Sequence, residues 1–441
     1  MSEELIVIGG GLAGSEAAWQ AALRGIDVCI YEMRPGKMTE AHRTGNLGEL
    51  VCSNSLRSND LYSAPGLLKK ELSMAGSLIM EAAVNSSVPA GSALAVDRGV
   101  FSEFISRRLS GHPRIRIVRE ELTQLPETIA VLATGPLTSR PMTASLAELL
   151  GGDHLYFYDA IAPIIDADSI EYEKVYRASR YGKGGDDYIN CPMNKEEYEA
   201  FYTALIEADR VTPREFEEQR VFEGCMPIEV MASRGKDTIR FGPMKPVGLP
   251  DPKTGKEPYA VVQLRAENTQ LTAYNIVGFQ TRLKWPEQKR VFGMIPGLAN
   301  AEFLRYGSLH RNTFINSPLF LSRDLTLKSK ENIFIAGQIS GVEGYIESTA
   351  MGLIAGINAS LKIKGKTTGE VPPSTAHGAL IRHITGPESK HFQPSNINFG
   401  LFPVPGELLK IRDKRKRKAM IVERALTDWE EYMAKVKLSI A

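Results

Sequence analysis

Cysteine is scarce and scattered in this chain of 441 residues. The four cysteines, Cys29, Cys52, Cys191 and Cys225, form no CxxC pair. Neither a zinc site nor a disulfide framework is therefore predicted, and we expect no metal site. Isolated thiols suit a reducing compartment, so we predict a cytoplasmic protein.

An excess of one charge, a leader segment and a long apolar run are also missing. Lys and Arg number 53 against 52 Asp and Glu, which gives a net charge of +1. This balance argues against a protein that coats polyanions, so any nucleic-acid contact requires local clustering of charge. The opening residues MSEELIVIGG have no basic n-region, so no signal peptide is predicted. No apolar run approaches the roughly 20 residues of a membrane span, so no membrane association is expected.

A strand, a glycine turn, a helix and a second strand are predicted in succession at the N-terminus. Residues 5–8 form an apolar strand, residues 9–14 satisfy GxGxxG, residues 15–23 form a helix, and the strand at 28–31 ends on Glu32. In this order the glycines serve the tight turn, the approach of a pyrophosphate and helix–strand packing, while the acid binds a ribose. The unit predicts a dinucleotide site. Its predicted contacts are Ile8, Gly9, Gly10, Gly11, Leu12, Ala13, Gly14, Glu32 and Arg34.

Two later segments favour FAD over a nicotinamide dinucleotide as the resident cofactor. A buried strand at 129–133 ends in Thr134 and Gly135, and another at 332–336 ends in Gly337, followed by Gly341 and a helix at 347–362. The first resembles the second nucleotide-contacting turn of two-dinucleotide-fold flavoproteins. No second complete GxGxxG unit is present, so NADPH or NADH would dock transiently.

The middle of the chain differs in character from both ends. It holds predicted strands at 259–264 and 275–279, a charged helix at 195–208, and a Pro/Gly-rich irregular segment at 241–250. We predict an α/β fold: a Rossmann-type FAD-binding domain of the two-dinucleotide-fold type with an inserted α+β domain. The predicted segments are 1–140 (FAD domain), 141–305 (inserted substrate and folate side), 306–365 (return to the FAD domain) and 366–441 (connection and basic helix).

The C-terminal segment begins as a predicted surface connection and ends as a helix. Residues 366–406 are rich in Pro, Gly, Ser and Asn and include His377, His383 and His391. The following KIRDKRKRK, at 410–418, has seven basic residues and one acid in nine positions. This run is either a solvated helix face or a patch that contacts phosphates. For the second alternative the candidates are Lys414, Arg415, Arg417 and Lys418.

Two cysteines are candidates for nucleophilic catalysis. Cys52 lies in LVCSNSL and Cys225 in FEGCMPIE. Either is a candidate nucleophile if cations lower its pKa, although a cysteine in a folded protein is by default a buried apolar residue. Trp285 and His310 are candidates for stacking on a flat ligand, the alternatives being a surface aromatic residue and a hydrogen-bonded histidine.

Several longer motifs resemble one family. They are GGGLAGSEAA at 9–18, YEMRP at 31–35, VCSNSL at 51–56, FGPMKPVGL at 241–249, LKWPEQKR at 283–290 and GVEGYIES at 341–348. They are similar to the folate- and FAD-dependent tRNA (uracil-5-)-methyltransferases, TrmFO, which are related to the MnmG/GidA family. The similarity runs from Ile6 to the basic helix.

The resemblance implies methylation of a T-loop uridine of tRNA at C5, giving ribothymidine. It implies 5,10-methylenetetrahydrofolate as carbon donor and NADPH or NADH as reductant, acting through FAD and without S-adenosylmethionine. Cys225 is then favoured as the thiolate that adds to uracil C6, with Cys52 near the flavin, although the two roles are interchangeable at this stage.

The remaining roles follow from the same resemblance. Glu343 or Glu347 is implied as the base or a pterin anchor, Trp285 and His310 as parts of the folate pocket, and the basic helix as a tRNA contact. The related wobble-uridine enzyme is much longer, which argues against it. Two alternatives stay open: the same reaction on a ribosomal RNA uridine, and a non-catalytic flavin-containing RNA-binding or redox protein. The sequence does not indicate the oligomeric state.

Overall fold

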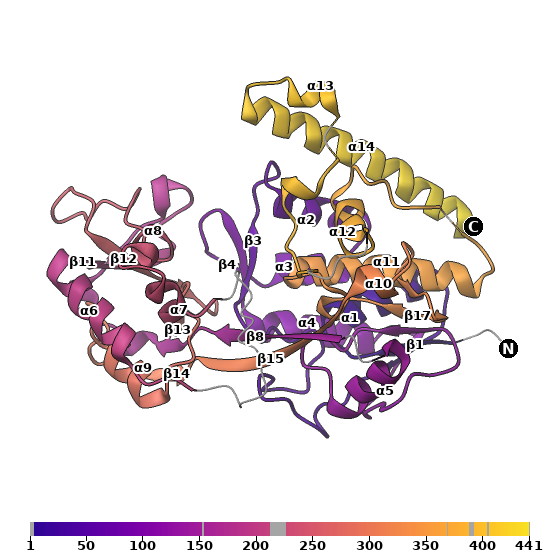
Figure 1. Cartoon of the computed structure of the whole chain (residues 1–441), viewed down its shortest axis with the longest axis horizontal. Helices are drawn as coiled ribbons and strands as arrows, with labels where there is room; N and C mark the ends of the chain where they lie inside the picture. Colours follow the sequence, from indigo (N-terminus) through magenta and orange to yellow (C-terminus); the bar gives the residue numbers. More distant parts are fainter. Residues whose placement is uncertain are drawn as a thin grey trace.

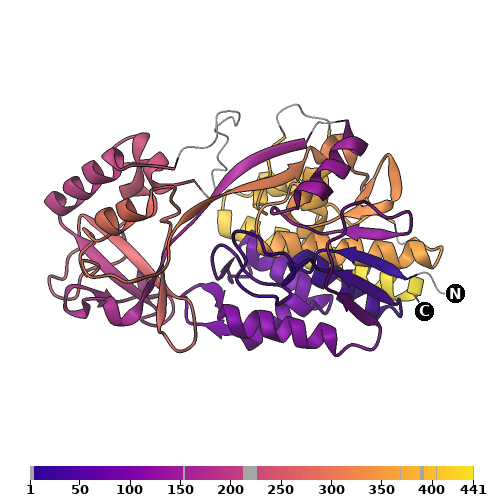
Figure 2. The ribbon, with the colours of Figure 1, turned by 90° about the horizontal axis from the view of Figure 1, so that it is seen from below.

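The chain folds into a larger and a smaller lobe joined by a two-stranded ribbon (Figure 1). The computed structural model describes residues 4–151, 154–211, 226–367, 369–387, 392–403 and 405–440. Strands β8 (His154–Ile161) and β15 (Ser308–Ile315) pair antiparallel along their whole length and form the ribbon. Figure 2 shows them crossing from one lobe to the other.

A six-stranded sheet in the order β16-β17-β7-β1-β2-β6 forms the centre of the larger lobe. The strands are β1 (Leu5–Ile8), β2 (Val28–Tyr31), β6 (Ile115–Val118), β7 (Ala130–Leu132), β16 (Thr326–Leu327) and β17 (Lys330–Ile335). All neighbours are parallel except β16, which runs antiparallel to β17. The apolar residues of the central strands pack on both faces, as expected for a covered parallel sheet.

Helices cover the two faces of this sheet. On one face α1 (Leu12–Leu23) lies against α11 (Tyr345–Ile363) and forms a core with Val7 and Val131. On the other, α5 (Arg140–Leu150) packs on Ile8 and Leu132. Alternate strand residues thus serve opposite faces. Since α5 belongs to the larger lobe, we place the start of the inserted unit after it, whereas the sequence suggested residue 141.

The segment of the chain that connects β2 to β6 forms a small sheet and three helices. The strands are β3 (Ser55–Ser58), β4 (Ser87–Val88) and β5 (Ala93–Val96), in the order β3-β5-β4. The helices are α2 (Ala64–Met74), α3 (Leu78–Asn85) and α4 (Arg98–Ser110). A short helix, α10 (Ser317–Phe320), follows the ribbon.

The smaller lobe is an antiparallel sheet with helices, which confirms the predicted inserted α+β unit. Its strand order is β10-β11-β12-β13-β9-β14. The strands are β9 (Ile164–Asp166), β10 (Tyr176–Arg177), β11 (Tyr188–Met193), β12 (Ala260–Ala266), β13 (Ala273–Ile276) and β14 (Phe303–Arg305). The helices are α6 (Lys195–Glu207), α7 (Ile228–Ser233), α8 (Thr238–Phe241) and α9 (Trp285–Phe292). The lobe has its own hydrophobic core, which includes Cys191.

The C-terminal segment corrects one prediction. Residues 366–406 are not merely a surface connection, because α12 (Ala376–Ile384) is buried and His377 is fully enclosed. Its apolar residues Ala376, Ala379, Leu380 and Ile384 recur at helical spacing, a signal masked by the surrounding Pro, Gly and Ser. His391 lies outside the described residues. Helices α13 (Gly406–Leu409) and α14 (Lys414–Ile440) complete this part.

Candidate functional site

A cavity lies at the carboxyl ends of β1, β2, β7 and β17, with about 1000 Å³ of empty space when the part open to solvent is included. This edge is where ligands bind in open parallel sheets. Most of the predicted cofactor residues line it: Ile8, Gly9, Gly11, Leu12, Ala13, Glu32, Arg34, Thr134, Gly135 and Gly337. Gly10, Gly14 and Gly341 lie outside the lining.

The glycines of the first turn meet different surroundings. Gly9 has φ +99°, and a Cβ there would lie 2.7 Å from the Ala133 carbonyl oxygen. A Cβ at Gly14 would lie 1.8 Å from the Gly9 carbonyl oxygen. At Gly11 a Cβ would meet nothing within 4 Å. Gly9 and Gly14 therefore serve the protein's own packing, whereas Gly11 keeps space open beside the cavity.

The N-terminus of α1 is built to receive an anion. Gly11 occupies the N-cap position, so no side chain accepts a hydrogen bond from the first amides, and the first turn contains no acidic residue. The free amides and the positive end of the helix dipole favour a phosphate at this point.

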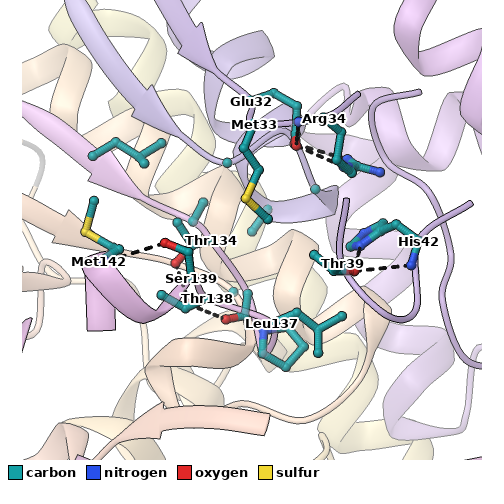
Figure 3. A pocket seen from close by; sticks show the side chains of 18 of the residues that line it. Glu32, Met33, Arg34, Thr39, His42, Thr134, Leu137, Thr138, Ser139 and Met142 are labelled. Carbon is teal, nitrogen blue, oxygen red and sulfur yellow. Dashed lines mark hydrogen bonds and ion pairs between the residues drawn. The ribbon is translucent and has the colours of Figure 1, made fainter. Parts of the chain in front are cut away.

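Glu32 stands ionised at the end of β2. Its Oε2 accepts hydrogen bonds from the Gly10 amide at 2.8 Å and from Arg34 Nη2 at 3.0 Å, and its Oε1 from Arg34 Nε at 2.9 Å. Burial opposes ionisation, but the hydrogen bonds and charge of Arg34 outweigh it, so the pKa of Glu32 is lowered. Figure 3 shows the Glu32–Arg34 pair on one wall of the cavity. The carboxylate lies where a ribose hydroxyl can donate to it.

The remaining walls carry hydroxyl groups and a neutral imidazole; of these residues sequence reasoning predicted Thr134 but missed Thr39, His42 and Thr138. Thr134 and Thr138 hydroxyls lie 2.7 Å apart, and Thr39 Oγ1 lies 2.7 Å from His42 Nδ1 (Figure 3). Burial and the nearby charge of Arg34 lower the pKa of His42 to about 4. His42 falls in no motif, and only its place in the loop after Glu32 hinted at a site.

Cys52 lies at the edge of the cavity, next to Val51 and Tyr345, which both line it. The Cys52 amide donates to the Tyr345 hydroxyl oxygen at 2.8 Å, and the Cys52 carbonyl accepts from Arg98 and Arg305 at 2.6 and 2.9 Å. Burial raises the pKa of Tyr345, so its phenol stays protonated. Arg98 and Arg305 fall in no sequence motif, and Tyr345 lies in the GVEGYIES motif at 341–348, which does not show that it binds Cys52.

Glu343 and Glu347 lie behind the cavity wall. Glu347 is fully buried, and its Oε1 accepts from Arg57 Nη1 at 3.3 Å and from the Ile397 amide at 3.0 Å. Burial raises its pKa. Glu343 Oε2 accepts from Gln338 Nε2 at 2.7 Å, and Gln338 does line the cavity. Their roles as base or pterin anchor stay predictions.

The predicted folate residues and the second cysteine are placed only in part. Trp285 is 62% exposed and stacks on Tyr306 with ring centroids 5.3 Å apart, and Tyr306 stacks in turn on Phe303 at 4.9 Å. Trp285 is not part of the cavity lining. His310 lies on β15, but its side chain is outside the description, and Cys225 lies outside the described residues.

The basic run opens α14 and faces solvent. Lys414, Arg415 and Lys418 are exposed and Arg417 is half-buried. Asp413 Oδ1 accepts from the Arg415 amide at 2.8 Å and caps the helix. Among the described residues, no group of three or more His, Cys, Asp or Glu side chains could hold a metal ion. No helix within the described ranges combines the length and apolar character needed to cross a membrane.

Comparisons with known proteins give a consistent set of relatives. The family model described as glucose inhibited division protein A matches residues 4–367. The methylenetetrahydrofolate–tRNA-(uracil-5-)-methyltransferase TrmFO of Moorella thermoacetica is 57% identical over 430 residues, covering 97% of this chain and 98% of that protein. The protein of the same name from Geobacter sulfurreducens is 56% identical over 438 residues, covering 99% and 100%. The structure of Aquifex aeolicus GidA in its form II crystal aligns with a TM-score of 0.69 at 17% identity, covering 99% of this chain and 75% of that one, and so shows the shared fold.

Proposed function

Because the chain belongs to the TrmFO family of methylenetetrahydrofolate–tRNA-(uracil-5-)-methyltransferases, we propose that it methylates C5 of a uridine in tRNA with 5,10-methylenetetrahydrofolate as carbon donor. The observation that carries this proposal is identity of 57% along 97% of the chain. The product is ribothymidine in the T-loop, and the reaction takes place in the cytoplasm.

The cavity fits FAD. The uncapped amides of α1 would hold its pyrophosphate, Gly11 leaves room for it, and the ionised Glu32 would accept a hydrogen bond from the adenosine ribose. The turns at Thr134 and Gly337, which follow β7 and β17, form further walls of the cavity. When bound, FAD supplies the redox chemistry and the one-carbon transfer between folate and uridine, with NADPH or NADH as the source of electrons.

The chain's own residues supply the nucleophile and the proton transfers. A cysteine thiolate forms a bond to uracil C6, which turns C5 into a carbon nucleophile. After C5 has gained its new carbon, a base takes the C5 proton, the C6–S bond breaks and the C5=C6 double bond returns. We assign the attack on C6 to Cys225 and place Cys52 beside the cofactor, where its amide and carbonyl are fixed by Tyr345, Arg98 and Arg305.

The experiment is a reconstituted assay with FAD-loaded protein, methylenetetrahydrofolate, NADPH and unmodified tRNA. We expect 5-methyluridine in tRNA, none when S-adenosylmethionine replaces the folate, and none in ribosomal RNA assayed in parallel. Methylation of ribosomal RNA alone would redirect the proposal to that substrate, and no methylation of either RNA would refute it.

The cysteine assignments have a matched control. Cys225→Ala and Cys52→Ala should each lower turnover by at least about 100-fold, because a missing nucleophile or partner group removes a chemical step. Cys191→Ala changes a thiol buried in β11 and should keep nearly full turnover. Full turnover of Cys225→Ala would show that another group attacks C6.

A further inference from the structure

The segment that carries Cys52 is held by guanidinium groups from distant parts of the chain. Arg98, the first residue of α4, donates to the carbonyl oxygens of Leu50 at 2.9 Å and Cys52 at 2.6 Å. Arg305, the last residue of β14, donates to those of Val51 at 3.2 Å and Cys52 at 2.9 Å. Three consecutive carbonyls are thus bound by two side chains.

The two arginines belong to different lobes. Arg98 is part of the larger lobe, whereas Arg305 is part of the sheet of the smaller lobe. Arg265, on β12 of the same small-lobe sheet, adds hydrogen bonds to Ser53 Oγ at 2.8 Å and Asn54 Oδ1 at 3.0 Å. The smaller lobe therefore binds residues 51–54 directly through hydrogen bonds from Arg265 and Arg305.

We propose that Arg305, together with Arg98, is a positioning residue that fixes the Cys52 backbone next to the cavity and so ties the orientation of the Cys52 thiol to the smaller lobe. The proposal rests on the proposed function for its consequence in turnover, but the geometry concerns the protein alone. A fork of two N–H groups spans neighbouring carbonyls in a way that one ammonium group does not.

The charges around Cys52 favour an anion. Arg98, Arg265 and Arg305 face one carboxylate, Glu267, which binds Arg98 Nε at 2.5 Å. The other titratable groups that act on Arg305 are Cys52 and Tyr345, and Tyr345 stays neutral. Burial and the charge of Arg98 lower the pKa of Arg305 to about 10, so it is still a cation at neutral pH. Positive charge stabilises a thiolate over a thiol.

Arg305 gives the cleaner test of the two. Arg98 shares a buried ion pair with Glu267, and removing one partner of such a pair strands the other charge. Arg305 instead binds carbonyl oxygens. Two variants separate its roles: Arg305→Gln removes charge and fork, and Arg305→Lys keeps the charge but loses the fork. Arg323→Gln is the matched control, because Arg323 pairs with Glu370 on an exposed surface.

The measurement is the rate at which iodoacetamide alkylates Cys52 in the full-length, FAD-loaded protein across a pH series, read from the mass of the Cys52 peptide. In the same preparations kcat and the KM for tRNA are determined. We expect Arg305→Gln to move the alkylation profile to higher pH and to lower kcat roughly tenfold or more, with a smaller change in KM. Arg305→Lys should keep the profile near the parent's but still lose kcat, and Arg323→Gln should match the parent.

The alkylation profiles and kcat values of the Arg305 variants either support or overturn the positioning role. A parental alkylation profile and kcat in Arg305→Gln would overturn the proposal. If Arg305→Gln fails to fold or to retain FAD, Arg305→Lys carries the test, and a parental kcat in that variant overturns it too. If the parent does not methylate tRNA, the proposed function fails, while the alkylation profiles still report on positioning.

Discussion

At the scale of single residues, the first glycine turn separates what the fold needs from what the cofactor needs. Gly14 leaves 1.8 Å between an added Cβ and a backbone oxygen, so substitution there disturbs the protein itself. Gly11 has no atom within 4 Å of an added Cβ. An alanine at Gly11 therefore leaves the apo-protein undisturbed and intrudes only on the ligand.

We predict that Gly11→Ala folds normally but binds FAD more weakly, by about tenfold or more, because its methyl group occupies the approach of the pyrophosphate. Flavin absorbance per protein and a titration of apo-protein with FAD measure this. Gly406→Ala is the control, since an added Cβ there also meets nothing within 4 Å and lies on α13. Equal FAD affinity in both variants would show that the pyrophosphate does not pass Gly11.

Sequence reasoning reached the residues of this turn because the motif is local. It did not predict that Arg98, Tyr345 and Arg305 bind Cys52, from 46, 293 and 253 positions away in the chain, although Tyr345 lies in a quoted motif. A lone arginine on a strand or helix has no pattern that reveals its partner. Contacts of this kind become visible only when the lobes are placed in space.

At the scale of secondary-structure elements, α14 packs on the larger lobe through an apolar face whose largest fully buried side chain is Trp429. The Trp429 ring stacks on His377 of α12 with centroids 4.2 Å apart, and its Nε1 donates to the Glu71 carbonyl oxygen of α2 at 2.9 Å. Glu71 Oε2 lies 2.7 Å from His377 Nδ1. Three helices thus share one buried polar contact. Composition led to the wrong expectation for α12, although the Ala/Gly-rich composition of 347–362 predicted α11 to within two residues at its start and one at its end.

We predict that Trp429→Ala destabilises the C-terminal region by about 3–5 kcal/mol, since it removes a large buried side chain and leaves a cavity. Denaturant unfolding and limited proteolysis of α14 report the loss. Leu438→Ala, at a residue 78% exposed on the same helix, should change neither. Equal protease resistance of the two variants would contradict a fastening role for Trp429.

At the scale of the whole molecule, the charge is balanced but unevenly placed. The net charge is +1, yet the start of α14 collects exposed cations that belong to no ion pair among the described side chains. Overall composition argues against a protein that coats polyanions in general. It could not show whether this end of the helix is a tRNA contact or a solvated face, because that depends on where the rest of the RNA lies.

We predict that changing Lys414, Arg415 and Lys418 together to Gln weakens tRNA binding and reduces the salt dependence of the affinity by about one unit of log–log slope per lost phosphate contact. Binding titrations over a series of salt concentrations measure both. The control changes Lys364 and Lys366, which follow α11, to Gln. An unaltered slope in the triple variant would identify the run as a solvated helix face.

The pairing of β8 with β15 has a further consequence. Because Ile161 and Ser308 are paired partners, the chain enters and leaves the smaller lobe at neighbouring points. A short hairpin turn joining these two positions would close the larger lobe without breaking any strand of its parallel sheet. The outer surface of the smaller lobe can thus be remodelled by evolution, or by an experimenter, without breaking the parallel sheet, whereas Arg265 and Arg305 must be kept because they bind residues 51–54 beside the cofactor site.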